Sequence, residues 1–196
     1  MTNQTPSSHT HELTPEERLA NAIEGIRHLP PVGGVTFRGI TTPRATAPSV
    51  LVTQNITATS CDLTVATIGL TSPGIAAVIL HTGRGVTPLS AVPQAQEVAL
   101  LPGTVLFTGR FVEIAEHTIE IVEQLLPTDD GQWTSSTTTE GLTRLTQAVA
   151  TAINNATGQP CPINTEYCER FTTPIAYKKD KRSKYHPEHT SRDTRS

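Results

Sequence analysis

The chain is poor in cysteine, in aromatic residues and in long apolar runs. Its 196 residues include three cysteines and one tryptophan, and aromatic residues make up 4% of the total. A small, odd number of cysteines argues against a disulfide framework, although Cys161 and Cys168 could pair in an oxidising compartment or remain two inert thiols. With so few aromatic rings, the core has to be built from valine, isoleucine, leucine and alanine.

Strong net charge and export or membrane segments are also missing. The formal charge of −3 provides no basic field, which argues against nucleic acid as a partner. The N-terminal residues are polar and lack the apolar region of a cleavable secretory signal, and no apolar run is long enough to cross a membrane. We therefore expect no membrane contact and a protein that is either cytoplasmic or exported by a non-Sec route.

Threonine is abundant, and β-branched residues favour strands. Before the strands, Thr14-Pro15-Glu16-Glu17 predicts a helix start, with a capping threonine, proline at the first helical position and a capping box. Short strand-like segments follow, among them the nearly continuous apolar run from Ile75 to His81. The order predicts an α+β domain over residues 13–127, with two packed antiparallel-rich β-sheets and an N-terminal helix.

The remaining residues have a different character. Residues 1–12 are polar, and we expect a disordered leader there. Residues 128–177 begin as a polar linker and continue into a C-terminal helical extension, because apolar residues recur at helical spacing over 140–154. Residues 178–196 are rich in lysine and arginine, which predicts a basic disordered tail.

One carboxylate stands out by its position. Glu97 comes directly before the apolar run from Val98 to Leu101, which ends in a Pro-Gly turn. This pattern places an acid at the mouth of a buried strand, where a rigid element can hold it against a ligand. A fixed anion there suits a reaction that builds positive charge, because it stabilises the cationic transition state more than the neutral ground state. The alternative is a strand-start glutamate that faces water.

Three blocks of sequence follow one another in a defined order. The first is Val35–Gly39, which ends in an Arg-Gly pair, the second is the hydroxyl-rich Ile56–Ser60, and the third combines Leu89–Ala91 with Gln96–Val98. Together they resemble the Arg–Ser–Glu class of NAD-dependent mono-ADP-ribosyltransferases, in which an arginine strand, a Ser-Thr-Ser strand and a glutamate strand occur in this order. The resemblance covers roughly residues 14–126.

The resemblance implies a role for each block. NAD+ would bind in a cleft between the sheets, as the substrate and without a metal. Arg38 and Gly39 would bind its phosphates, because a guanidinium pairs with phosphate oxygens at two points, and Thr57 or Thr59 would orient the ribose or the carboxylate. Glu97 would stabilise the oxocarbenium ion that forms as nicotinamide leaves. The implied activity is transfer of ADP-ribose to a macromolecule, a protein in our interpretation, by a toxin or effector.

Two departures from the family pattern bear on this activity. Ala95 stands two residues before Glu97, where the family has glutamate for arginine acceptors and glutamine for several others, so an arginine acceptor is disfavoured. A small shift of the loop could bring Gln94 into that role. Ala58 leaves Glu97 without an orienting hydroxyl if the strand register is shifted by one residue. Two further interpretations therefore stay open: an NAD+ glycohydrolase, and a non-catalytic module on a decayed form of the fold.

A zinc site is the remaining possibility that we considered. Cys161, Cys168, His186 and His189 are potential ligands, but the six residues between the cysteines form a wider gap than in zinc knuckles. We expect no metal.

Overall fold

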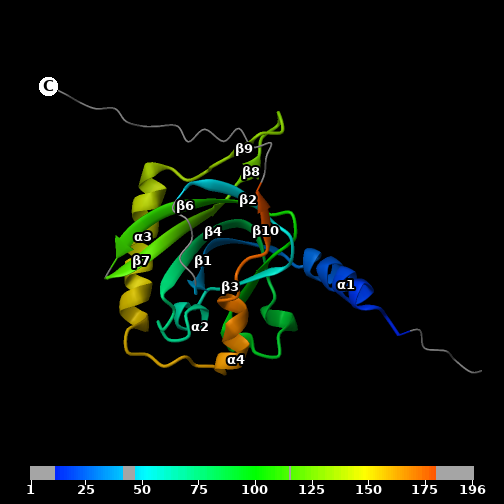
Figure 1. Ribbon diagram of the computed structural model, residues 1–196, viewed down its shortest axis with the longest axis horizontal. Coiled ribbons are helices and arrows are strands. Elements are labelled where there is room, and N and C mark those ends of the chain that lie inside the picture. Colours follow the sequence, from blue (N-terminus) through cyan, green and yellow to red (C-terminus); the bar gives the residue numbers. More distant parts are fainter. Residues whose placement is uncertain (1–11, 42–46, 115, 180–196) are drawn as a thin grey trace, which may run out of the picture.

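The computed structural model describes residues 12–41, 47–114 and 116–179, and helix α1 (Pro15–Arg27) is its first element (Figure 1). The hydroxyl of Thr14 accepts the N–H of Glu17, and the carboxylate of Glu17 accepts the N–H of Thr14 at 2.8 Å, which confirms the predicted capping box. The helix has no buried residue and lies beside the sheet in Figure 1. No helix in the described ranges is long and apolar enough to cross a membrane.

The strands form one large sheet and one small one. In the described part of the chain they are β1 (Pro31–Ile40), β2 (Ser49–Thr53), β3 (Thr57–Ser60), β4 (Gly74–Gly85), β5 (Glu97–Leu100), β6 (Val105–Ile114), β7 (His117–Gln124), β8 (Leu126–Pro127), β9 (Trp133–Thr134) and β10 (Tyr177–Lys179). Eight of them hydrogen-bond in the order β1-β3-β5-β4-β7-β6-β2-β10, and β8 pairs with β9. Only the β4–β7 pairing among these strands is parallel, so the predicted mixed fold with mainly antiparallel pairing is confirmed.

The large sheet curls because β4 pairs with three strands, with β1 along most of its length and with β7 and β5 at successive points. Both β1 and β5 pair with β3, and both also pair with β4. The pairing therefore runs continuously through eight strands, where the sequence predicted two separate sheets. Val98 and Leu100 of β5 reach the same apolar cluster as Ala76, Val78 and Leu80 of β4, so the curled sheet encloses a core between its two parts.

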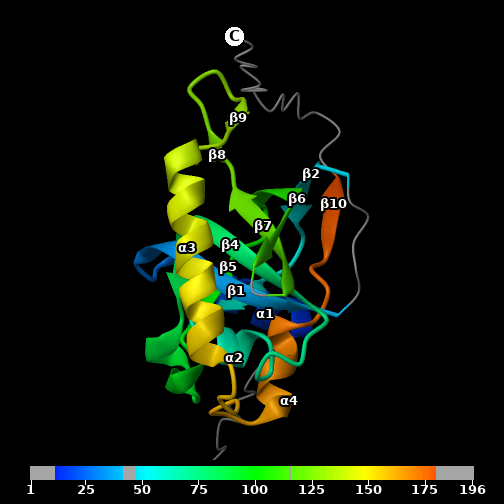
Figure 2. The ribbon, with the colours of Figure 1, turned by 90° about the vertical axis from the view of Figure 1, so that its left-hand side faces the viewer.

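Helix α3 (Thr139–Ala156) covers the other face of the sheet. It contributes Leu145, Val149 and Ile153 to a second apolar cluster that contains Phe37 and Ile119 from the strands. Figure 2 shows the helix lying along the sheet. The sequence predicted an amphipathic helix over 140–154, and in the structure α3 occupies this stretch and belongs to the same core as the strands.

The chain returns to the strands after α3. Helix α4 (Thr165–Cys168) and a 3₁₀ turn (Glu169–Phe171) pack near α2 (Leu63–Ala66), with Cys168 and Phe171 fully buried against Val65 and Ala95. Strand β10 then pairs with β2 at the sheet edge. The prediction of a disordered tail from residue 178 onward is therefore wrong for Lys178 and Lys179, because the open edge of β2 offers backbone partners to them. The rest of the predicted tail, and residues 1–11 of the predicted leader, lie outside the described residues.

Candidate functional site

Glu97 begins β5 and is 8% exposed. It follows Gln96, whose left-handed backbone (φ 46°) turns the chain into the strand. Because Val98 points into the enclosed core, Glu97 and Ala99 point to the opposite face of β5, where they line an open hollow of about 530 Å³. A volume of this size is in the range of small-molecule sites. The structure thus places the acid at the start of a buried strand, as the sequence predicted, and a hollow lies beside it.

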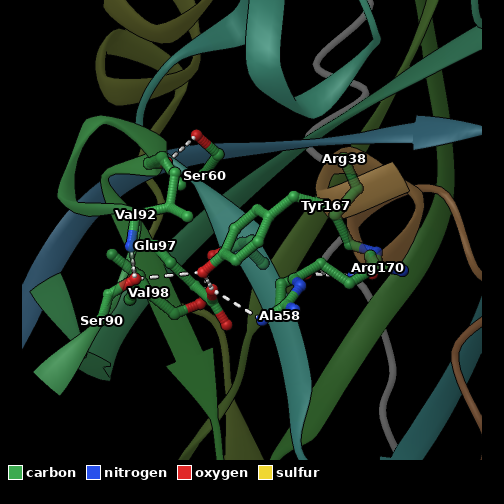
Figure 3. A network of polar contacts seen from close by, with 11 residues as sticks. Arg38, Ala58, Ser60, Ser90, Val92, Glu97, Val98, Tyr167 and Arg170 are labelled. Carbon is green, nitrogen blue, oxygen red and sulfur yellow. Dashed lines mark hydrogen bonds and ion pairs between the residues drawn. The ribbon is translucent and has the colours of Figure 1, made fainter. Parts of the chain in front are cut away.

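Two side chains from the C-terminal part hold the Glu97 carboxylate (Figure 3). The Tyr167 hydroxyl donates to Oε2 at 3.0 Å, and Nη1 of Arg170 lies 3.4 Å from the same oxygen. The Arg170 guanidinium also lies 3.8 Å from the centre of the Tyr167 ring, a cation–π arrangement. Both residues belong to the short stretch of α4 and the 3₁₀ turn, which with the two residues after it we call segment 165–173. Sequence reasoning missed both, although their spacing of three residues would place them on one helix face.

Segment 165–173 also reaches the loop before β5. The oxygen of the Ser90 hydroxyl lies 3.1 Å from the Tyr167 hydroxyl oxygen and accepts the N–H of Val92 at 3.0 Å. The loop before β5 is thereby tied to the same tyrosine that contacts Glu97.

The hydroxyl groups of β3 face two directions. In the register of β3 with β5, Thr59 lies opposite Val98 and Thr57 opposite Leu100, so both threonines share the face of the enclosed core. The Thr59 hydroxyl donates to the carbonyl of Val98 at 2.8 Å. The roles proposed for Thr57 and Thr59 at the ribose or at Glu97 stay predictions, and the described contacts lend them no support.

The other face of β3 is the one shared with Glu97. Ser60 lies directly opposite Glu97 and Ala58 opposite Ala99. The Ser60 hydroxyl donates to the carbonyl of Ala95 at 2.7 Å and accepts the N–H of Asp62 at 2.9 Å. It is therefore committed to the backbone, and Ala58 has no hydroxyl to offer.

Arg38 is buried, with 4% exposure, and its guanidinium binds backbone carbonyls. It donates to the carbonyls of Ala58 and Thr173, and it lies 3.4 Å from the carbonyl of Arg170. Arg38 and Glu97 therefore contact segment 165–173 from two sides, one at the backbone of Arg170 and the other at its side chain. Arg38 and Glu97 line different hollows. The hollow beside Arg38 is the smaller one, about 180 Å³, and segment 165–173 contributes residues to both. Phosphate binding by Arg38 stays a prediction.

Gly39 follows Arg38 at a crowded point. A Cβ at this position would lie 2.3 Å from the Ser72 hydroxyl oxygen, 2.8 Å from Cγ2 of Thr172 and 3.0 Å from the carbonyl oxygen of Ala66. Packing against the protein is thus sufficient to require glycine here, independently of the predicted approach of a phosphate.

Ala95 is fully buried, in the apolar cluster that also holds Phe171. Its neighbours Gln94 and Gln96 are both exposed. A side chain two residues before Glu97 consequently points into the protein, whereas the glutamines on either side of it reach solvent.

The sulfur atoms of Cys161 and Cys168 lie 3.3 Å apart, and both cysteines are free. Burial, together with the neighbouring Cys161 thiol, raises the pKa of Cys168 to about 12.

In the described ranges, no three residues of the types that ligate metals lie together. Of the four potential zinc ligands, His186 and His189 are outside those ranges.

The raised pKa predicts how stability depends on pH. Cys168 ionises near its ordinary pKa of 9.0 in the unfolded chain and only near about 12 in the folded protein. The contribution of Cys168 to the free energy of unfolding is therefore complete below pH 9.0 and is lost as the pH rises towards about 12, because the thiol loses its proton first in the unfolded chain. Urea unfolding of the wild type should show a midpoint that falls over this range, and the fall should be shallower for Cys168→Ala. Equal slopes for the two proteins would contradict the assignment.

Comparison with known proteins gives matches among solved structures. The chain is similar to the ADP-ribosyltransferase HopU1 of Pseudomonas syringae (TM-score 0.46, 15% identity, 55% of this chain and 51% of that one). It is also similar to the ADP-ribosyltransferase Vis, a toxin from Vibrio splendidus (TM-score 0.44, 15% identity, 62% and 66%). A third match is exoenzyme S from Pseudomonas aeruginosa, solved with human 14-3-3 protein beta and Carba-NAD (TM-score 0.43, 19% identity, 58% and 60%).

The matched part therefore spans about half to two thirds of the length of these three proteins. No family model matches the sequence, and no curated protein matches it.

Proposed function

We propose that the protein transfers ADP-ribose from NAD+ to a protein acceptor and releases nicotinamide, on an ADP-ribosyltransferase-like fold and as a toxin or effector. One observation carries the proposal: the Glu97 carboxylate is buried at the start of a rigid strand, lines an open hollow, and is held by a hydroxyl and a guanidinium. The order of the Arg38, β3 and Glu97 blocks in the sequence supports the same conclusion.

The chemistry needs few groups from the protein. Nicotinamide in NAD+ already carries a positive charge, so the bond from its nitrogen to the ribose C1′ breaks with the electron pair leaving on nitrogen, and no proton has to be donated. The ribose becomes an oxocarbenium ion, which the fixed charge of Glu97 stabilises from nearby. A nucleophile of the acceptor then bonds to C1′ and loses its proton to solvent water.

The dinucleotide also carries negative charge, for which the site has two guanidinium groups. Arg170 has 47% of its side chain exposed and lines the hollow of Glu97, so its guanidinium is accessible to a phosphate there. Arg38 would first have to exchange the carbonyls of Arg170 and Thr173 for phosphate oxygens. We therefore propose Arg170 as a phosphate contact in addition to the predicted Arg38.

A second candidate function is NAD+ hydrolysis, with water in place of the acceptor. The burial of Ala95 favours it, because that position presents no polar side chain to an acceptor. In this case the same carboxylate serves the same transition state.

Incubation with NAD+ labelled in its adenylate part, in the presence of a cell lysate, tests the proposal. Release of nicotinamide together with a labelled protein is expected for the transferase. Nicotinamide release with only free labelled ADP-ribose would establish the glycohydrolase instead. If no nicotinamide is released and NAD+ does not raise the melting temperature, neither activity is present and the non-catalytic interpretation stands.

A further inference from the structure

A directed chain of hydrogen bonds ends on the Glu97 carboxylate (Figure 3). Tyr167 donates its hydroxyl proton to Oε2 of Glu97 at 3.0 Å. A phenol has a single proton, so in the 3.1 Å contact between Ser90 and Tyr167 the serine must be the donor. Ser90 in turn accepts the N–H of Val92. Each bond of such a chain polarises the next one, and all of them point towards the negative charge.

Among the described residues, strand β3, which pairs with β5 at Glu97, supplies no hydroxyl to the carboxylate. The hydroxyl of Ser60 is committed to Ala95 and Asp62, and Ala58 on the same face has none. Thr59 donates on the opposite face, to Val98. The hydroxyl that reaches the carboxylate therefore comes from a segment 70 residues further along the chain.

The position of the Tyr167 ring is fixed by packing on several sides. Its ring lies 6.4 Å from the ring of Phe171, at an interplanar angle of 53°, and the Arg170 guanidinium lies over its face. The neighbouring Cys168 is fully buried, as is Phe171, so both anchor the segment in the core. A hydroxyl on such a support can hold its partner in one orientation.

We propose that Tyr167 is the positioning residue for Glu97, and that it takes the place of the strand hydroxyl missing at Ala58. This inference rests on the proposed function. Tyr167 aims the carboxylate at the ribose and, through Ser90, ties the loop before β5 to the same point. Tyr167 thereby holds the Glu97 carboxylate and the loop before β5 in one fixed position relative to each other.

Tyr167→Phe tests the proposal, because it removes one oxygen and leaves the ring for Phe171 and Arg170. We expect kcat for nicotinamide release to fall about tenfold to a hundredfold, the usual effect of losing a supporting contact to a catalytic group. KM for NAD+ should change by no more than about threefold, since the hydroxyl acts through Glu97 and not on the substrate. Glu166→Gln, at the exposed residue next to Tyr167 in α4, is the control and should keep kcat within about twofold.

Two double variants sharpen the assignment. Adding Ser90→Ala to Tyr167→Phe should cause no further loss of kcat, because the chain is already broken at Tyr167. Ala58→Ser in the Tyr167→Phe protein offers a new hydroxyl on the Glu97 face, within reach of a long side chain from the diagonal position, and recovery of kcat there would support the proposal.

The outcomes separate the inference from the proposed function. If the wild type releases nicotinamide and Tyr167→Phe keeps its kcat, or loses activity only through KM, the positioning role is wrong and the function stands. Additive losses for Ser90→Ala and Tyr167→Phe would also overturn it. If the wild type releases no nicotinamide, the proposed function fails, and the positioning role fails with it.

Discussion

Glu97→Gln is expected to lower kcat for nicotinamide release by about a hundredfold to a thousandfold, while KM for NAD+ stays within a few-fold. The amide keeps the shape of the side chain but loses its charge. That charge matters most when the ribose becomes cationic, so the loss falls on the transition state and spares the ground state. Initial rates of nicotinamide release over a range of NAD+ concentrations separate the two parameters.

Glu166→Gln provides the control for this experiment. Glu166 is an exposed neighbour of Tyr167 in α4, and the substitution makes the same chemical change close to the site. Its kcat should stay within about twofold of the wild type. A Glu97→Gln protein that retains its turnover, or that loses binding and turnover equally, would remove Glu97 from the proposed role.

Arg38→Met is expected to destabilise the protein by about 3 kcal/mol, because buried carbonyls lose charged donors and segment 165–173 loses its contact with β1. For a protein of this size, the melting temperature should fall by about 6–12 °C. Methionine keeps most of the apolar stem, so the loss reports mainly on the hydrogen bonds. Urea unfolding followed by the fluorescence of Trp133, the single tryptophan, measures it.

Arg144→Met is the matched control, since Arg144 is paired with Glu140 on the surface of α3 with 76% of its side chain exposed. It should change stability by less than about 0.5 kcal/mol. Equal effects of the two substitutions would contradict the structural role of Arg38. If KM for NAD+ also rises in Arg38→Met under conditions where it is folded, the predicted phosphate contact gains support, and an unchanged KM would restrict Arg38 to holding the segment.

Helices α1 and α3 and the apolar strands could be predicted because their signals are local. The capping box at Thr14 and Glu17 and the periodic apolar residues of α3 require only neighbours within a few turns. Continuity of the sheet could not be predicted, since it depends on where the two halves of β4 find their partners. The pairing of Lys178 and Lys179 was missed for a similar reason, because their composition favours a solvated tail and only the open edge of β2 gives them a strand to join.

The site likewise has one part that local sequence signals predict and one part that depends on long-range packing. The sequence by itself determined that one acid, Glu97, begins a buried strand, because the apolar run and the turn after it are adjacent in the chain. Only the tertiary structure decided which groups surround that acid. A shift of one residue in strand register exchanges the faces of Thr59 and Ala58. Tyr167 and Arg170 lie about 70 residues after Glu97, and only the packing of the folded chain brings them to its carboxylate.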